Sequence, residues 1–153
     1  MIREERDIEF WHDIASHPAV RGALMGLDPL QVADVASLPT VLPLASDNGG
    51  WFIGAMDGLG LVGEIHAIYR PAGWGREAAQ AGKEAMDWAF RVFQVLVVHE
   101  IESNPHSRPA ISAGFVLAGD WQHTAVGKIR MWVLTRAAWE TSPMHRRMKC
   151  HQQ

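Results

Sequence analysis

The spacing of apolar residues divides the chain into helical and extended segments. In residues 8–16 and 76–93 the apolar side chains recur every three to four positions, which predicts an amphipathic helix in each range. Residues 18–25 favour a further short helix. Residues 27–39 fit a helix more loosely, with Pro29 suited to its first turn. The clearest of these helices is 76–93, whose polar residues share one face.

Short runs between turn residues predict a set of strands. Residues 1–7 are expected to form a short edge strand, and the other strands are expected at residues 40–44, 51–56, 61–69, 94–101, 115–121 and 128–135. Asp57-Gly58 favours a tight hairpin turn, so residues 40–69 are typical of an antiparallel meander. The helix at 76–93 joins two strands in a right-handed βαβ unit, which makes those two strands parallel. We therefore expect an α+β domain with a mixed sheet flanked by helices.

The turn between the first of these parallel strands and the long helix is rich in glycine. A helix N-terminus offers unpaired backbone N–H groups and the positive end of the helix dipole, and both favour a phosphate. Gly73 and Gly75 let the backbone approach such a ligand closely, and Arg76 can donate a charge-assisted hydrogen bond. The carboxylate of Glu77 repels phosphate unless it points away from the turn. The alternative is that the glycines only turn the strand into the helix.

A second motif follows the next strand. Asn104 followed by Pro105 is typical of a helix N-cap with proline in the first helical position, and Gly114 ends the short helix. Together with the order of elements, these two motifs resemble the GNAT acetyltransferase superfamily over roughly residues 40–137. In that family an asparagine ends the second parallel strand, a small residue follows three positions later, and a Gly-Phe pair closes the helix. Here these positions are Asn104, Ser107 and Gly114-Phe115.

The pyrophosphate loop of the family can be aligned with this chain in two registers. One register takes Arg70 to Gly75 as the R-x-x-G-x-G sequence. The other places the loop at Trp74 to Ala79, and we prefer it because it keeps the spacing of Pro71 and starts the helix where its periodicity starts. The resemblance implies that the chain binds acetyl-CoA or a related acyl-CoA. The implied binding residues are Ile68, Tyr69, Gly73, Trp74, Gly75, Arg76, Glu77, Ala78, Ala79, Asn104 and Ser107.

Glu64 and His66 form the candidate catalytic pair. Residues two apart on a strand share a face, and in the family the middle of this strand faces the acceptor. A carboxylate or an imidazole there can take a proton as an amine attacks the thioester. The alternative is that the two side chains hydrogen-bond across the sheet or support a loop. His66 can also approach His99, but no ligand spacing indicates a metal site, so we expect none.

One feature of the family is missing from this chain. The family commonly has a tyrosine on the second helix as general acid to the CoA thiolate, whereas this chain has Ile111 and Ser112 there. Its single tyrosine, Tyr69, lies on another element. Three functions therefore stay open. One is acetyl transfer from acetyl-CoA to a primary amine of unknown identity, and another is a catalytically inactive GNAT-fold binding or assembly protein. The third is an unrelated α+β binding module, in which the turn motifs are coincidence. The segment that begins at Glu64 also resembles the compact GNAT-like proteins of phages.

Composition and charge indicate which partners and which compartment to expect for the protein. The net charge of −3 argues against general nucleic-acid binding, and no apolar run is long enough to predict a membrane span. The charged first residues do not fit a secretory signal, and the single cysteine, Cys150, fits a reducing compartment, so we expect a cytoplasmic protein. We expect one domain over residues 1–142 and a mobile basic tail over residues 143–153. GNAT proteins often dimerise, so a homodimer is an open expectation.

Overall fold

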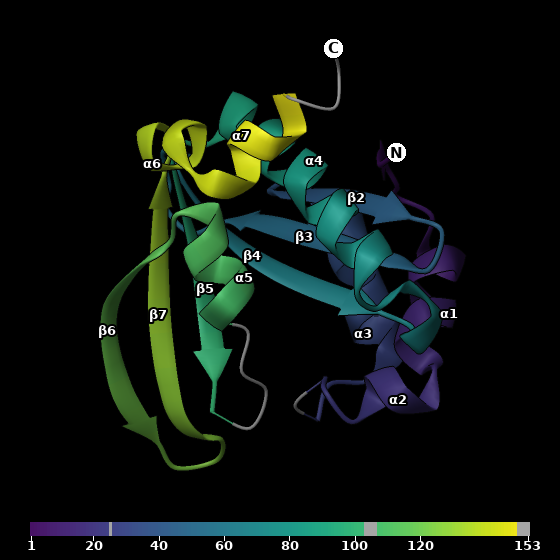
Figure 1. Ribbon diagram of the computed structural model, residues 1–153. Helices are drawn as coiled ribbons and strands as arrows, with labels where there is room; N and C mark the ends of the chain where they lie inside the picture. The colour runs from purple at the N-terminus through teal and green to yellow at the C-terminus, as the bar shows by residue number, and fades with distance from the viewer. Residues whose placement is uncertain (25, 103–106, 150–153) are drawn as a thin grey trace.

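One mixed sheet of seven strands runs through the computed structural model, in which residues 1–24, 26–102 and 107–149 are described. The strands are β1 (Arg3–Glu4), β2 (Val41–Ser46), β3 (Gly49–Ala55), β4 (Val62–Tyr69), β5 (Val95–Ile101), β6 (Val116–His123) and β7 (Gly127–Thr135). Their order across the sheet is β1-β2-β3-β4-β5-β7-β6 (Figure 1). Neighbouring strands are antiparallel except β4 and β5, which are parallel. The predicted meander and the predicted parallel pair are thereby confirmed.

The parallel strands β4 and β5 pair only at their beginning. Their register runs from Val62 beside Val95 to Glu64 beside Val97 and then stops, although both strands continue. Figure 1 shows the two strands diverging. We call the region beyond Glu64 and Val97 the β4–β5 fork. Because backbone N–H and C=O groups require hydrogen-bond partners, the facing strand edges in this fork are suited to pair with a ligand.

Helices pack on both faces of the sheet. They are α1 (Ile8–Ser16), α2 (Pro18–Arg21), α3 (Pro29–Asp34), η1 (Val35–Ser37), η2 (Pro71–Gly73), α4 (Arg76–Val92), α5 (Ser107–Ala113), α6 (Arg136–Thr141) and α7 (Pro143–Lys149). Helix α4 connects β4 to β5 across one face, whereas α1, α2 and α3 pack on the other. Helix α1 matches its predicted range, and Pro29 lies in the first turn of α3 as predicted, although α3 is shorter than the predicted range 27–39. None of the described helices is both long and apolar enough to cross a membrane.

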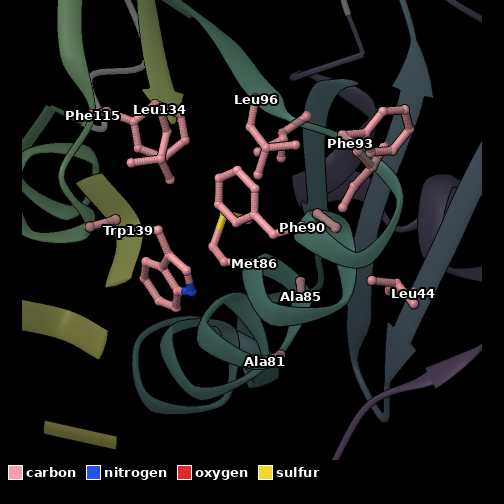
Figure 2. Packing of buried hydrophobic residues seen from close by; sticks show 14 of the residues in the cluster. Leu44, Ala81, Ala85, Met86, Phe90, Phe93, Leu96, Phe115, Leu134 and Trp139 are labelled. Atoms are coloured by element: carbon pink, nitrogen blue, oxygen red, sulfur yellow. The ribbon is translucent and has the colours of Figure 1, made fainter. Parts of the chain in front are cut away.

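Small side chains let α4 lie close to the sheet. The helix turns Ala81, Ala85 and Ala89 toward the strands, and Met86 and Phe90 fill the space beside them. Figure 2 shows these residues meeting side chains from the sheet and from the C-terminal helices, among them Leu44, Leu96, Leu134 and Trp139. The predicted apolar face of the long helix is therefore the centre of the main core.

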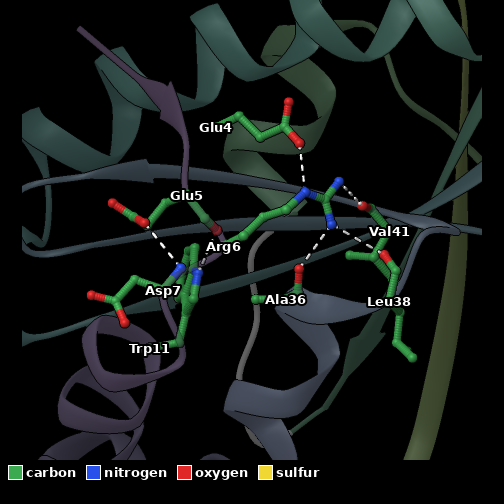
Figure 3. Close-up of polar contacts among 8 residues, drawn as sticks. All are labelled: Glu4, Glu5, Arg6, Asp7, Trp11, Ala36, Leu38 and Val41. Carbon is green, nitrogen blue, oxygen red and sulfur yellow. Dashed lines mark hydrogen bonds and ion pairs between the residues drawn. The ribbon is translucent and has the colours of Figure 1, made fainter.

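The N-terminal segment is fastened to the opposite face of the sheet. Trp11 of α1 packs on Phe52 of β3 with ring centroids 4.3 Å apart, and its indole N–H donates to the backbone oxygen of Glu5 at 2.8 Å. Arg6 donates to the carboxylate of Glu4 and to the backbone oxygens of Ala36, Leu38 and Val41 (Figure 3). These bonds hold α1 and the segment after α3 against β2.

The end of the chain differs from the prediction of a mobile tail. Residues 143–149 form helix α7, which lies against α4, α5 and α6, so the prediction is wrong for this range. Met144 packs on the main core, and the ring of His145 lies 5.1 Å from that of Trp139. Helix α6 was not predicted at all. Residues 150–153 lie outside the described part of the chain.

The connection between β3 and β4 is longer than the predicted tight turn. Residues 56–61 form a loop, so the two-residue turn expected at Asp57-Gly58 is wrong. The carboxylate of Asp57 accepts the backbone N–H groups of Leu61 and Val62 at 2.9 and 3.1 Å. These side-chain bonds close a wider loop than a two-residue hairpin turn requires.

Candidate functional site

The start of α4 has the geometry of an anion site. The N-cap residue, Gly75, has φ +80° and ψ −108°, a conformation that glycine adopts far more readily than other residues. A Cβ atom placed on Gly75 would meet no atom within 4 Å, so the space in front of this turn is open. The first N–H groups of α4 have no acceptor within the helix, and together with the helix dipole they attract negative charge. The exposed side chain of Arg76 adds a cation at the same end.

Glu77 points away from this anion site. Its Oε1 atom accepts hydrogen bonds from the Ser46 hydroxyl at 2.7 Å and from the backbone N–H of Asn48 at 2.9 Å. Its Oε2 atom accepts from the amide side chain of Asn48 at 2.8 Å. Burial raises the pKa of Glu77, but the hydrogen bonds from Asn48 and Ser46 outweigh it and lower that pKa. The carboxylate therefore ties α4 to the β2–β3 turn, and the repulsion of phosphate considered from the sequence is relieved.

Replacing Glu77 by alanine is expected to lower the free energy of unfolding by about 1–2 kcal/mol, because three hydrogen bonds to a charged group are lost. Since the pKa of Glu77 lies below its ordinary 4.5, its contribution is complete above pH 4.5 and is lost as the pH falls through the lowered pKa. Urea unfolding at pH 7 and below pH 4.5 measures the difference. The exposed neighbour Gln80, changed to alanine, is the control, and an equal loss there would contradict the assignment.

The end of β4 is held by the residues that precede α4. The Trp74 indole N–H donates to the backbone oxygen of Tyr69 at 2.9 Å, while the ring itself is 59% exposed. Gly73 is buried, and a Cβ atom there would lie 2.8 Å from atoms of both Asn48 and Tyr69. Packing alone therefore requires a glycine at position 73. Trp74 keeps an exposed aromatic surface beside the open turn at Gly75.

Two predicted binding residues on β4 turn their side chains away from the fork. Ile68 packs against the core cluster that contains Trp11, on the face of the sheet covered by α1. Tyr69 is buried in the α4 core, where its hydroxyl lies 3.2 Å from the Ser46 hydroxyl and burial raises its pKa. Only the backbone of these residues can face a ligand in the fork. The phenol of Tyr69 is thus placed on the wrong side to act as an acid in the fork.

The remaining predicted binding residues differ in their position and in how much of them the structure describes. Ala78 packs against the core and Ala79 is exposed on the first turns of α4. Asn104 lies outside the described residues, so its predicted role stays a prediction. Ser107 begins α5, and nothing is described of its side chain. Gly114 follows α5 with φ +96°, which agrees with the predicted end of that helix.

Glu64 lies where β4 and β5 separate and contacts two histidines. Its Oε1 atom is 2.6 Å from Nδ1 of His99 on β5 and 3.4 Å from Nε2 of His66 on β4. The His99 ring meets the Trp121 ring of β6 edge to face, with centroids 5.6 Å apart. The side chains of Glu64 and His99 are 28% and 25% exposed, whereas that of His66 is 60% exposed. The predicted proximity of Glu64 and His66 is confirmed, and His99 is the partner that sequence reasoning left without a role.

The electrostatics of this cluster keep Glu64 ionised. The hydrogen bond with His66 and then that with His99 hold the pKa of Glu64 at about 2, although burial acts in the opposite direction. A carboxylate with so low a pKa is a weak proton acceptor near neutral pH, but it is a strong acceptor of imidazole N–H bonds. Among the described residues no group of three or more His, Cys, Asp or Glu side chains is arranged to hold a metal ion.

A separate hollow of about 410 Å³ adjoins the start of α4 on the side of the β2–β3 turn. Its lining residues are Met1, Ser46, Ala72, Trp74, Arg76, Glu77, Gln80 and Ala81. The hollow shares Trp74 and Arg76 with the anion site but contains none of Glu64, His66 and His99. It therefore adds no group to the chemistry of the fork.

Known proteins match this chain at the level of structure. No protein-family model and no curated protein sequence matches it. A variant of the spermidine N-acetyltransferase SpeG from Vibrio cholerae matches with a TM-score of 0.73 and 14% identity, covering 92% of this chain and 98% of its own. RimJ from Mycobacterium smegmatis, in complex with CoA-disulfide, matches with a TM-score of 0.72 and 18% identity, covering 98% and 88%.

A third match is the aminoglycoside acetyltransferase AAC(6')-Ib in complex with coenzyme A. Its TM-score is 0.71 and its identity 16%, with 92% of this chain and 96% of that chain covered. Identities this low carry the fold and no more. The chain has the GNAT acetyltransferase fold, as its sequence motifs predicted.

Proposed function

We propose that this chain binds acetyl-CoA, or a related acyl-CoA, and transfers the acyl group to a primary amine. The observation that carries the proposal is the β4–β5 fork, which leads from the Glu64 cluster to the open N-terminus of α4 at Gly75. Two structural neighbours with the same fold are the spermidine N-acetyltransferase SpeG and the aminoglycoside acetyltransferase AAC(6')-Ib, and the AAC(6')-Ib and RimJ structures contain coenzyme A or its disulfide. A long ligand with an anion at one end and a reactive acyl group at the other fits this layout.

In the proposed complex each part of the ligand meets a different part of the fork. The pyrophosphate takes the free N–H groups at the start of α4, with Arg76 beside it. The amide groups of the extended arm pair with the free backbone edges of β4 and β5. The thioester then lies toward Glu64, where a backbone N–H of the fork can polarise its carbonyl group. Holding the amine and the thioester side by side supplies most of the rate enhancement.

The proton of the attacking amine leaves through the cluster formed by Glu64 and the two histidines. The hypothesis drawn from the sequence places Glu64 and His66 in contact with the amine, directly or through water. The described part of α5 carries Ile111 and Ser112 and no tyrosine, so the leaving thiolate takes its proton from another group or from solvent.

Acetyl-CoA at 1 mM is expected to raise the melting temperature of the protein. A ligand at about 100 times its dissociation constant stabilises the native state by about 2.7 kcal/mol. For a chain of this size that stabilisation corresponds to roughly 5–10 °C. Differential scanning fluorimetry with acetyl-CoA, and with adenosine as a control that lacks the pyrophosphate arm, measures the effect. An unchanged melting temperature at millimolar acetyl-CoA would contradict the cofactor assignment.

A second candidate function is that of a GNAT-fold binding or assembly protein without catalysis. Release of the CoA thiol distinguishes the proposed acyl transfer from this candidate. The second candidate is favoured by the absence of a tyrosine on α5 and by the low pKa of Glu64, about 2. The assay follows free CoA from acetyl-CoA with a panel of primary amines that includes spermidine and an aminoglycoside. Release above the acetyl-CoA blank supports transfer, and binding without release supports the second candidate.

A further inference from the structure

We propose that His99, held in place by Glu64, is the group that takes the proton of the attacking amine in this fork. This inference rests on the proposed acyl transfer and assigns its proton acceptor. His99 lies on β5, opposite the strand that carries Glu64 and His66. In this assignment His99 is the catalytic residue and Glu64 is its positioning residue.

The contact between Glu64 and His99 fixes the tautomer of the imidazole ring. An ionised carboxylate can only accept hydrogen bonds, so the 2.6 Å contact between Glu64 Oε1 and His99 Nδ1 requires the proton to be on Nδ1. The lone pair is then on Nε2, on the far side of the ring. The same orientation of an imidazole by a carboxylate operates in Ser-His-Asp hydrolases, where the carboxylate does not itself take the proton.

The surroundings of His99 keep the ring in one orientation and leave it accessible. The edge-to-face contact with Trp121, at 5.6 Å, holds the plane of the ring from the side of β6. The His99 side chain is 25% exposed, so part of the ring stays open to solvent. The titratable side chains that act on the Glu64 carboxylate are His66 on its own strand and His99 on the neighbouring strand.

His66 is the less suitable of the two histidines. Its Nε2 atom is 3.4 Å from Glu64 Oε1, against 2.6 Å for His99 Nδ1. His66 lowers the pKa of Glu64 more than His99 does, but the longer contact fixes the ring less firmly. Its side chain is 60% exposed, so water competes with every contact that would fix the ring. A base must be held within hydrogen-bond reach of the proton that it takes, and only His99 is held by a short bond.

The reaction can be written with His99 as both acceptor and donor of one proton. The lone pair of the neutral amine forms the C–N bond at the thioester carbon, and the carbonyl π pair moves to oxygen. His99 Nε2 takes the N–H proton. The carbonyl group forms again, the C–S bond breaks, and its electron pair leaves on sulfur. The imidazolium then protonates the thiolate, which restores His99 and makes a tyrosine on α5 unnecessary.

The kinetic test compares His99→Gln, Glu64→Gln and His66→Gln in the intact protein, with His12→Gln on α1 as a control outside the fork. The assay uses acetyl-CoA and an amine that the wild type acetylates. We expect His99→Gln to lower kcat at least about 100-fold, the usual contribution of general acid–base catalysis, with an unchanged KM for acetyl-CoA. Glu64→Gln should lower kcat by at least tenfold, and His66→Gln should have the smallest effect of the three. Full activity of His99→Gln, or a larger loss in His66→Gln, overturns the assignment.

The positioning role of Glu64 has its own readout. Long-range proton–nitrogen NMR spectra of the wild type at pH 8 should show His99 protonated at Nδ1, and Glu64→Gln should add the Nε2-protonated tautomer. A residue that only supports the fold would not change the tautomer, so an unchanged spectrum overturns this part. If the wild type releases no CoA with any amine, the proposed function fails together with this inference. If the wild type is active and His99→Gln is equally active, this inference alone fails.

Discussion

Replacing Trp139 with alanine will lower the free energy of unfolding by about 3–5 kcal/mol, the range found for large aromatic residues removed from a core. Trp139 is 1% exposed, and its indole N–H donates to Asp87 of α4 at 2.7 Å. Its ring also contacts His145 of α7. The substitution therefore leaves a cavity between α4 and the C-terminal helices and removes the hydrogen bond that the indole donates to the Asp87 carboxylate. A loss of this size is a large fraction of the stability of a typical domain.

Urea unfolding, followed by circular dichroism, measures this loss. The variant Trp139→Phe is the matched control, because it keeps most of the buried ring and loses only the bond to Asp87. We expect it to be destabilised by less than half as much as Trp139→Ala. If Trp139→Ala unfolds at the urea concentration of the wild type, then α6 and α7 are not an integral part of the domain.

The C-terminal helices are a part of the fold that could not be predicted from the sequence. The helix at 76–93 was predicted because apolar residues recur along its length, and α4 follows that pattern. Helices α6 and α7 are too short for such a pattern, and each is anchored by few residues, chiefly Trp139 and Met144. Short helices gain most of their stability from tertiary packing. That packing depends on where α4 lies, which the local sequence of residues 136–149 does not contain.

In the candidate site, too, local features were predicted from the sequence and contacts between distant segments were not. The turn at Gly75 and the pair Glu64 and His66 were found from the sequence because each is a local pattern. The direction of Glu77 was not, because its partners Ser46 and Asn48 lie on a distant hairpin. A role for His99 could not be found either, since its contact with Glu64 follows from the register of two parallel strands. One signal was present in the sequence: side chains alternate along β5, so His99 shares a face with Val97, and Val97 is the residue beside Glu64 in the sheet.

Replacing Gly75 with valine will remove about half of the stabilisation by acetyl-CoA, or more. A branched side chain at φ +80° is strained, and it also fills the open space before the first N–H groups of α4. We expect binding at least about tenfold weaker, which corresponds to about 1.4 kcal/mol. The shift in melting temperature at 1 mM acetyl-CoA should fall to about half that of the wild type or less.

The chain offers a matched control for the strain itself. Gly60 has φ +68° and, like Gly75, would meet no atom within 4 Å with a Cβ atom added, but it lies in the loop between β3 and β4. Gly60→Val and Gly75→Val should both lower the stability of the free protein, by roughly 1–2 kcal/mol. Only Gly75→Val should weaken the response to acetyl-CoA, measured by fluorimetry and by calorimetric titration. If the two variants respond equally to acetyl-CoA, the pyrophosphate binds elsewhere. Gly75 would then serve only to turn β4 into α4.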